Sequence, residues 1–252
     1  MLGAEIKLVK SLSQKKNRDR HGLFLVEGGK MVEELTGSAF VTRKIITTRP
    51  LPFPVGGRRL EQVSVATMAR LSALKTPPSV LAVVEKPAAA ECPLPVPGEL
   101  LLALDNVQDP GNLGTVIRLA DWFGICRIVC SPDTADCYNP KVVQATMGAI
   151  FRVKVHYAAL PEFLQRAKKS VAVYGAFLDG DNIYQKPLTS GGVVVVGNEG
   201  NGISPGVAAA ISERLFIPPF PAGAVTSESL NVAVSTAILC AEFRRRGYSV
   251  IR

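Results

Sequence analysis

The sequence predicts an α/β protein with two domains, a small amino-terminal one and a larger carboxyl-terminal one built on a parallel sheet. Short apolar runs typical of strands alternate with stretches of helical spacing. The runs of the second half, such as VVVV at 193–196, are unbroken, as in strands buried on both faces of a parallel sheet. A proline-rich stretch, KPAAAECPLPVPGE at 86–99, separates the halves. We therefore expect domains at 1–86 and 100–252, joined by a linker at 87–99.

The amino-terminal domain is expected to stack helices and strands in three layers. A weakly amphipathic helix carrying Ile6, Val9 and Leu12 comes first. Strands are then expected at 23–28, 40–47, 61–65 and 80–85, and helices at 30–35 and 67–74. Its length is normal for one compact domain.

The carboxyl-terminal domain alternates more regularly, as expected of an α/β sheet domain. Its strands are expected at 100–104, 127–131, 152–157, 171–177, 193–197 and 214–218, and its helices at 111–124, 139–146, 160–169, 205–212 and 228–246. Asn112 lies at the start of the helix expected at 111–124, and Ser227 just precedes the one expected at 228–246; both residue types are good helix N-caps.

The composition limits the cellular setting and the chemistry. Hydrophobic residues make up 47% of the chain, yet no apolar run approaches the roughly 20 residues of a membrane span. The first residues lack the pattern of a signal peptide. Five cysteines without a CxxC pair, and only two histidines, argue against a disulfide framework and against a metal site. We expect a cytoplasmic protein without a membrane partner.

The positive charge is concentrated at the beginning of the chain. The net charge is +8, and residues 1–95 hold 15 Lys and Arg against 8 Asp and Glu. Residues 96–252 hold 14 Lys and Arg against 13 Asp and Glu. This asymmetry indicates a polyanionic partner, with nucleic acid favoured over a basic surface that has no specific partner.

Three segments of the second half combine a short apolar run with a tight loop that carries polar side chains. They are 105–118 (DNVQDPGNLGTVIR), 193–204 (VVVVGNEGNGIS) and 217–231 (IPPFPAGAVTSESLN). Because ligands bind at the carboxyl ends of strands in α/β proteins, we expect one composite site. Each segment alone also has a purely structural interpretation: a surface Arg118, a turn Glu199, and polar residues that begin a helix.

In combination, the order and spacing of NxxxxxR, GNEGxGIS and IPxxxxxxxxSxSLN resemble the SpoU/TrmH family of RNA ribose methyltransferases, within the SPOUT superfamily. The resemblance covers nearly all of 100–246, including Asn139-Pro140-Lys141 and Met147-Gly148-Ala149. The stretch 6–35 resembles the family's accessory RNA-binding domain. The resemblance implies a trefoil knot in the carboxyl-terminal domain. It also implies transfer of a methyl group from S-adenosyl-L-methionine to a ribose 2′-hydroxyl.

The resemblance also assigns roles to individual residues. The catalytic positions are Arg118, Asn112, Glu199, Ser229 and Asn231, and the cofactor-binding positions are Gly197, Ile217 and Leu230. Arg118 would approach the ribose hydroxyl, as a general base or, more easily for a permanently charged guanidinium, as an electrostatic clamp. Glu199 would orient Arg118 by a charge-assisted hydrogen bond. A sulfonium methyl is already activated, so no metal is expected.

The expected partner is RNA, with ribosomal RNA preferred to transfer RNA. The RNA-binding residues are expected to be Lys15, Lys16, Arg18, Arg20 and Lys30. The family resemblance further implies a homodimer formed through the carboxyl-terminal domain. Two alternatives stay open, namely the same chemistry on transfer RNA, and an RNA-binding dimer without catalysis.

Overall fold

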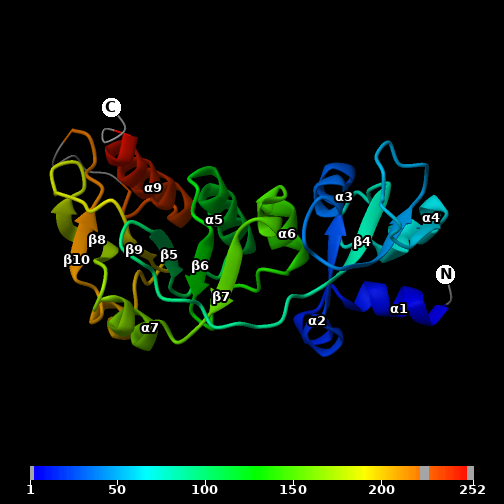
Figure 1. Cartoon of the computed structure of the whole chain (residues 1–252), viewed down its shortest axis with the longest axis horizontal. Helices are drawn as coiled ribbons and strands as arrows, with labels where there is room; N and C mark the ends of the chain where they lie inside the picture. Colours follow the sequence, from blue (N-terminus) through cyan, green and yellow to red (C-terminus); the bar gives the residue numbers. More distant parts are fainter. Residues whose placement is uncertain (1–2, 222–226, 249–252) are drawn as a thin grey trace. The chain divides into compact units, whose positions relative to one another are not determined.

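The computed structural model describes residues 3–221 and 227–248, and the chain divides into two compact units (Figure 1). The amino-terminal unit consists of Met1–Ala89 together with Asp136–Arg152, which we call the returning segment. The carboxyl-terminal unit consists of Ala90–Ala135 and Val153–Arg252. Thus the chain leaves the second unit after Ala135, contributes 17 residues to the first, and goes back.

The amino-terminal unit is built on a four-stranded mixed sheet in the order β1-β4-β2-β3. β4 is antiparallel to β1 and β2, and β3 is parallel to β2. The strands are β1 (Leu23–Glu27), β2 (Thr42–Thr47), β3 (Leu60–Gln62) and β4 (Val80–Glu85). The helices are α1 (Gly3–Ser11), α2 (Lys15–His21), α3 (Gly29–Thr36) and α4 (Val65–Leu71), with α6 (Pro140–Thr146) and the 3-10 helix η1 (Ala149–Phe151) in the returning segment. The sequence did not predict α2.

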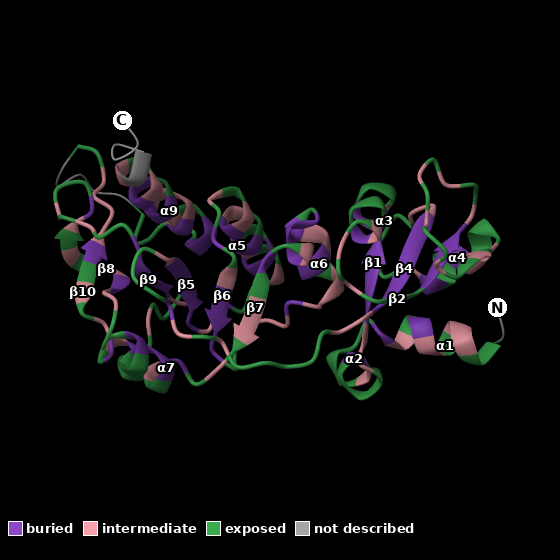
Figure 2. Cartoon of the chain, viewed as in Figure 1, coloured by how far each residue is buried: buried purple, intermediate pink, exposed green. Residues whose placement is uncertain are grey.

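Alternating side chains of this sheet build a core on each of its faces, which gives the expected three layers. Figure 2 shows that strands β1 and β4 are largely buried. On one face Leu25, Leu81 and Val83 pack with residues of α1 and α4. On the other face Phe24 and Val84 pack with residues of α3 and of the returning segment. The returning segment therefore completes one of the two outer layers.

The carboxylate of Asp19 lies between two ammonium groups, at 2.6 Å from Lys15 Nζ and 2.5 Å from Lys86 Nζ. The hydrogen bonds from Lys15 and then Lys86 lower the pKa of Asp19 to about 2. A carboxyl whose pKa is lowered by folding stabilises the protein fully above its unfolded pKa, here about 3.9, and this contribution disappears as the pH falls toward 2. We expect Asp19→Asn to flatten part of the acid dependence of the urea midpoint between pH 4 and 2. Glu33→Gln, at an exposed carboxylate of the same unit, is the control, and identical acid profiles for Asp19→Asn and the wild type would contradict the prediction.

The carboxyl-terminal unit is a six-stranded sheet in the order β10-β8-β9-β5-β6-β7, and every neighbouring pair is parallel. The strands are β5 (Leu100–Leu104), β6 (Arg127–Cys130), β7 (Lys154–Tyr157), β8 (Val173–Asn182), β9 (Gly192–Val196) and β10 (Glu213–Phe216). The helices are α5 (Pro110–Trp122), α7 (Leu160–Ala167), α8 (Pro205–Ala208) and α9 (Val232–Tyr248). The predicted parallel α/β sheet is confirmed, whereas the knot stays a prediction.

Helices cover both faces of this sheet. α7 and α8 pack on the face that carries Leu101 and Ala103. α5 and α9 lie on the opposite face, where Phe243 of α9 meets Tyr174 of β8 with ring centroids 5.1 Å apart (Figure 1). All residues of β5 and β9 are buried, which explains their unbroken apolar sequences. Within 3–221 and 227–248, no helix has the length and apolar character that crossing a membrane requires.

Two helices start differently from expectation. As a result, the side chain of Asn112 is not used as a cap, and Glu228 and Ser229 lie before α9 instead of within it. α5 is capped by Asp109, whose Oδ1 accepts from Asn112 N at 2.8 Å, so Asn112 is not the cap. α9 begins at Val232 rather than at Glu228, and Asn231 Oδ1 accepts from Ala233 N at 2.9 Å. Residues 222–226 lie outside the described part of the chain.

Candidate active site

The candidate site lies at the carboxyl edge of the parallel sheet. β5 and β9 are neighbours at its centre, and the chain runs from β5 outward to β6 and β7 before it returns on the other side. This is a topological switch point, where ligands bind in open α/β sheets. Asp105 and Gly197 directly follow these two strands, and Ile217 follows β10.

A cavity of about 490 Å³ opens at this edge. Its walls are the ends of β8, β9 and β10, the glycine-rich loop at 197–203, and residues 228–230 before α9. Gly197, Ile217 and Leu230, the three expected cofactor-binding residues, all line it, as do Glu199 and Ser229. The volume lies in the usual range of small-molecule sites, about 300–1,000 Å³. The structure thus brings residues from two of the three sequence segments into one cavity wall.

The glycine-rich loop is fixed to the end of β5 by two side chains that sequence reasoning did not assign to the site. Asn198 Oδ1 accepts from Gly200 N and Asn201 N at 2.9 and 3.0 Å, and its Nδ2 donates to Asn106 O at 2.9 Å. Asp105, which is buried, accepts from Ser204 N at 2.7 Å. The only sequence signal for Asp105 is a carboxylate directly after a buried strand.

Glycine is required where this loop closes on itself. A Cβ on Gly197 would lie 2.2 Å from the carbonyl carbon of Gly202, a distance at which backbone would have to move. Gly202 itself has a φ of +67°, in the left-handed region that favours glycine. The closed shape of the loop therefore depends on glycine at both positions.

Three of the five expected catalytic residues form a hydrogen-bonded row beside the cavity. Asn231 Nδ2 donates to Asn112 Oδ1 at 3.0 Å, and Asn112 Nδ2 donates to Glu199 Oε1 at 2.5 Å. Asn231 Oδ1 is held at the same time by the first turn of α9. Each amide is therefore oriented, and all three sequence segments meet in this row.

Arg118 does not join the row. It lies on α5, is exposed, and is not part of the cavity wall. Its side chain makes no hydrogen bond or ion pair with any residue of 3–221 or 227–248, so the expected Glu199–Arg118 contact does not form within one copy of the chain. Trp122, one turn further on the same face of α5, is 84% exposed.

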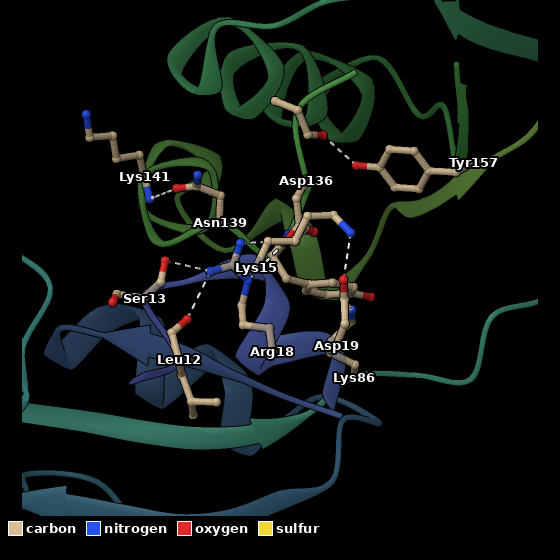
Figure 3. Close-up of polar contacts among 12 residues, drawn as sticks. Leu12, Ser13, Lys15, Arg18, Asp19, Lys86, Asp136, Asn139, Lys141 and Tyr157 are labelled. Carbon is tan, nitrogen blue, oxygen red and sulfur yellow. Dashed lines mark hydrogen bonds and ion pairs between the residues drawn. The ribbon is translucent and has the colours of Figure 1, made fainter. Parts of the chain in front are cut away.

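The expected RNA-binding residues divide into exposed and buried ones. Lys15, Lys16, Arg20 and Lys30 are exposed on α2 and α3. Arg18 is only 1% exposed, and its guanidinium is used entirely inside the amino-terminal unit (Figure 3). Arg18 therefore has a structural role, and the expectation that it contacts RNA is corrected.

A cavity formed by a glycine-rich loop at the carboxyl edge of a parallel sheet, with a row of oriented polar side chains beside it, is typical of an α/β enzyme that uses a small-molecule ligand. A model of the SpoU rRNA methylase family matches residues 99–241, and a model of the MRM3-like substrate binding domain matches residues 4–82. The chain belongs to the SpoU rRNA methylase family, and the family resemblance seen in the sequence is confirmed.

Known proteins resemble the chain over nearly its whole length. The 23S rRNA (guanosine(2553)-2′-O)-methyltransferase RlmP of Bacillus subtilis (strain 168) is 33% identical, over 95% of this chain and 96% of its own. A TrmH-family protein from Porphyromonas gingivalis superposes with a TM-score of 0.87 at 41% identity, covering 98% and 99% of the two chains. An AdoMet-bound rRNA methyltransferase from Sinorhizobium meliloti superposes with a TM-score of 0.83 at 27% identity, covering 97% of this chain and 95% of its own.

Proposed function

We propose that this enzyme transfers a methyl group from S-adenosyl-L-methionine to a ribose 2′-hydroxyl of ribosomal RNA. The observation that carries the proposal is the cavity lined by Gly197, Ile217 and Leu230 beside the row of Asn231, Asn112 and Glu199. The Bacillus subtilis relative is named for this reaction, and the Sinorhizobium meliloti structure holds the same cofactor, which supports the proposal.

The cavity suits a cationic nucleoside. Its wall offers apolar surface from Leu178, Ile203 and Ile217, next to main chain of the glycine-rich loop. Glu199 and Glu228 also line it, as does Asp179, whose carboxylate is already paired with Arg214, and the described wall itself contains no Lys, Arg or His. The carboxylates of Glu199 and Glu228 complement a sulfonium centre. When bound, S-adenosyl-L-methionine supplies a methyl group on a positively charged sulfur, already activated for attack.

The remaining chemistry is alignment of the ribose hydroxyl, which loses its proton to water, and stabilisation of the developing alkoxide. The chain's own side chains serve the alignment and the stabilisation. Asn231 and Asn112 hold Glu199 at the cavity wall by consecutive hydrogen bonds. Ser229, also in the wall, can hold the nucleotide by its hydroxyl. Arg118 is the electrostatic clamp on the neighbouring phosphate and the developing alkoxide.

The position of Arg118 supports a homodimer formed through the carboxyl-terminal unit. Arg118 and Trp122 lie on the outer face of α5, and Trp122 adjoins Ala241 of α9 in a shallow depression. Exposed apolar surface next to polar groups marks interaction sites. We infer that a second copy packs on this face, so that Arg118 of one copy completes the site of the other.

The five free cysteines fit a reducing cytoplasm.

The proposal is tested with methyl-labelled cofactor and two RNA pools, deproteinised ribosomal RNA and transfer RNA. We expect label in ribosomal RNA, located on a ribose by nucleoside analysis. Label found only in transfer RNA would show that the enzyme methylates transfer RNA instead of ribosomal RNA. Cofactor binding without label in either pool would favour the RNA-binding dimer without catalysis.

Asn198 is expected to act as a positioning residue for the cofactor site. Asn198→Ala removes the three hydrogen bonds that shape the glycine-rich loop and fix it to Asn106. We expect calorimetry to show a roughly tenfold weaker affinity for S-adenosyl-L-methionine, equivalent to about 1.4 kcal/mol, and an unchanged affinity for RNA. Gln185→Ala, at an exposed amide of the same unit, is the control. Unchanged cofactor affinity in Asn198→Ala would show that the loop needs no such support.

A further inference from the structure

The two units differ sharply in charge. The amino-terminal unit, counted with the returning segment, holds 17 Lys and Arg against 8 Asp and Glu. The carboxyl-terminal unit holds 12 Lys and Arg against 13 Asp and Glu. All of the chain's positive excess is therefore in the amino-terminal unit, and the returning segment contributes Lys141 and Arg152 to it. This matters because the matched methylase region, 99–241, contains the returning segment, whereas the matched substrate-binding region, 4–82, does not.

A buried ion pair fastens the beginning of the returning segment to α2. Arg18 Nε and Nη2 donate to Asp136 Oδ2 at 3.0 and 2.6 Å (Figure 3). Arg18 Nη1 donates to Leu12 O and Ser13 O, both at 2.9 Å, just beyond the end of α1. Asp136 Oδ1 in turn accepts from Tyr138 N at 3.0 Å, which sets the turn that leads into α6.

Apolar and close-packed contacts hold the rest of the returning segment. The ring of Tyr138 lies 4.6 Å from that of Phe24, centroid to centroid, and Lys86 Nζ lies 5.5 Å from the Tyr138 centroid. Near the other end, Gly148 lies against the end of the Glu34 side chain of α3 and has a φ of +94°, which favours glycine. A larger residue at 148 would be strained by this φ, although the flexible Glu34 side chain could move aside. The segment is an integral layer of the amino-terminal unit.

This packing leaves specific cations free to bind another molecule. Lys16 and Arg20 of α2 and Lys141 of α6 are exposed, and their charged groups have no hydrogen bond or ion pair among the described residues. Figure 3 shows Lys141 next to Asn139, on the helix that follows Asp136. Arg18 and Asp136 therefore tie together the two elements, α2 and the start of α6, that carry these free cations.

We propose that the returning segment is part of the RNA-binding surface, and that Lys141 binds an RNA phosphate together with Lys16 and Arg20. This inference rests on the proposed function for its ligand, a phosphodiester chain. Point charges on flexible stems bind phosphates without reading sequence, so the surface orients the RNA and adds affinity. The methylase region of the sequence thereby supplies substrate-binding contacts as well as catalytic ones.

The test uses the full chain, deproteinised ribosomal RNA and a series of KCl concentrations. Each lost phosphate contact lowers the slope of log affinity against log salt by about 0.7–0.9. We expect Lys141→Gln to lower the slope by about that amount and to weaken binding several-fold at low salt, with cofactor affinity unchanged. Lys168→Gln, an exposed lysine of the carboxyl-terminal unit with the same change of charge, should bind RNA as the wild type does.

Two results would overturn the inference. Lys141→Gln could bind RNA with wild-type affinity and slope while Lys16→Gln is weakened, which would confine the surface to α2. Lys141→Gln and Lys168→Gln could also weaken binding equally, which would show only a response to net charge. Failure of the proposed function is distinguishable from both, because wild-type protein would then transfer no methyl group to ribosomal RNA.

Discussion

Replacing Arg118 with alanine is expected to lower the single-turnover rate of methyl transfer at saturating RNA by about 100- to 1,000-fold, the usual loss when one preorganised charge-stabilising donor is removed. The affinity for S-adenosyl-L-methionine should be unchanged, because Arg118 is outside the cavity wall and, among the described residues of one copy, makes no hydrogen bond to the glycine-rich loop. A parallel loss of cofactor affinity would show that Arg118 supports the fold of the site instead.

Mixing two inactive variants tests whether Arg118 acts across the homodimer. A dimer of one Arg118→Ala subunit and one Glu199→Ala subunit has one intact site if each site combines Glu199 of one copy with Arg118 of the other. Random exchange of subunits in a symmetric dimer then restores about one quarter of the wild-type activity. No restored activity after demonstrated exchange would mean that both residues serve the same subunit, and the inferred sharing of sites would be wrong.

The cavity was predictable from sequence because parallel strands end at a common edge. Gly197 and Ile217 belong to different sequence segments, yet each directly follows a strand of the same sheet. The helix caps were less predictable. Asp109 and Asn112 are both good cap residues, and so are Ser227 and Asn231. The choice between them depends on contacts between segments, such as the hydrogen bond from Asn231 to Asn112, which no local pattern contains.

Arg18 shows more clearly that contacts between distant segments cannot be predicted from local sequence. It lies in the run KKNRDR, which is typical of a solvated basic surface, and it has no apolar neighbours at helical spacing. Its partner Asp136 is 118 positions away. Because the buried face of α2 is made by an arginine, hydrophobic periodicity did not reveal this helix. The same ion pair is one of the contacts that hold the returning segment in the amino-terminal unit.

Arg18→Met is expected to lower the free energy of unfolding by about 3–5 kcal/mol, as when one partner of a buried ion pair is removed. The loss leaves the carboxylate of Asp136 uncompensated at 10% side-chain exposure, and Leu12 O and Ser13 O lose their donor. Urea denaturation followed by circular dichroism measures the change. Lys16→Met, two residues earlier and exposed on the same helix, should change stability by no more than about 0.5 kcal/mol.

The double variant Arg18→Met with Asp136→Leu separates the ion pair from simple loss of volume. Replacing both partners with apolar residues removes the buried unpaired charge, so the double variant should be more stable than Arg18→Met alone. Arg18→Lys should recover only part of the stability, since an ammonium cannot span Asp136 and the two carbonyl oxygens as a guanidinium does. If Arg18→Met cost no more than Lys16→Met, the returning segment would be held by its apolar contacts alone, and the ion pair would not be what fastens Lys141 in place.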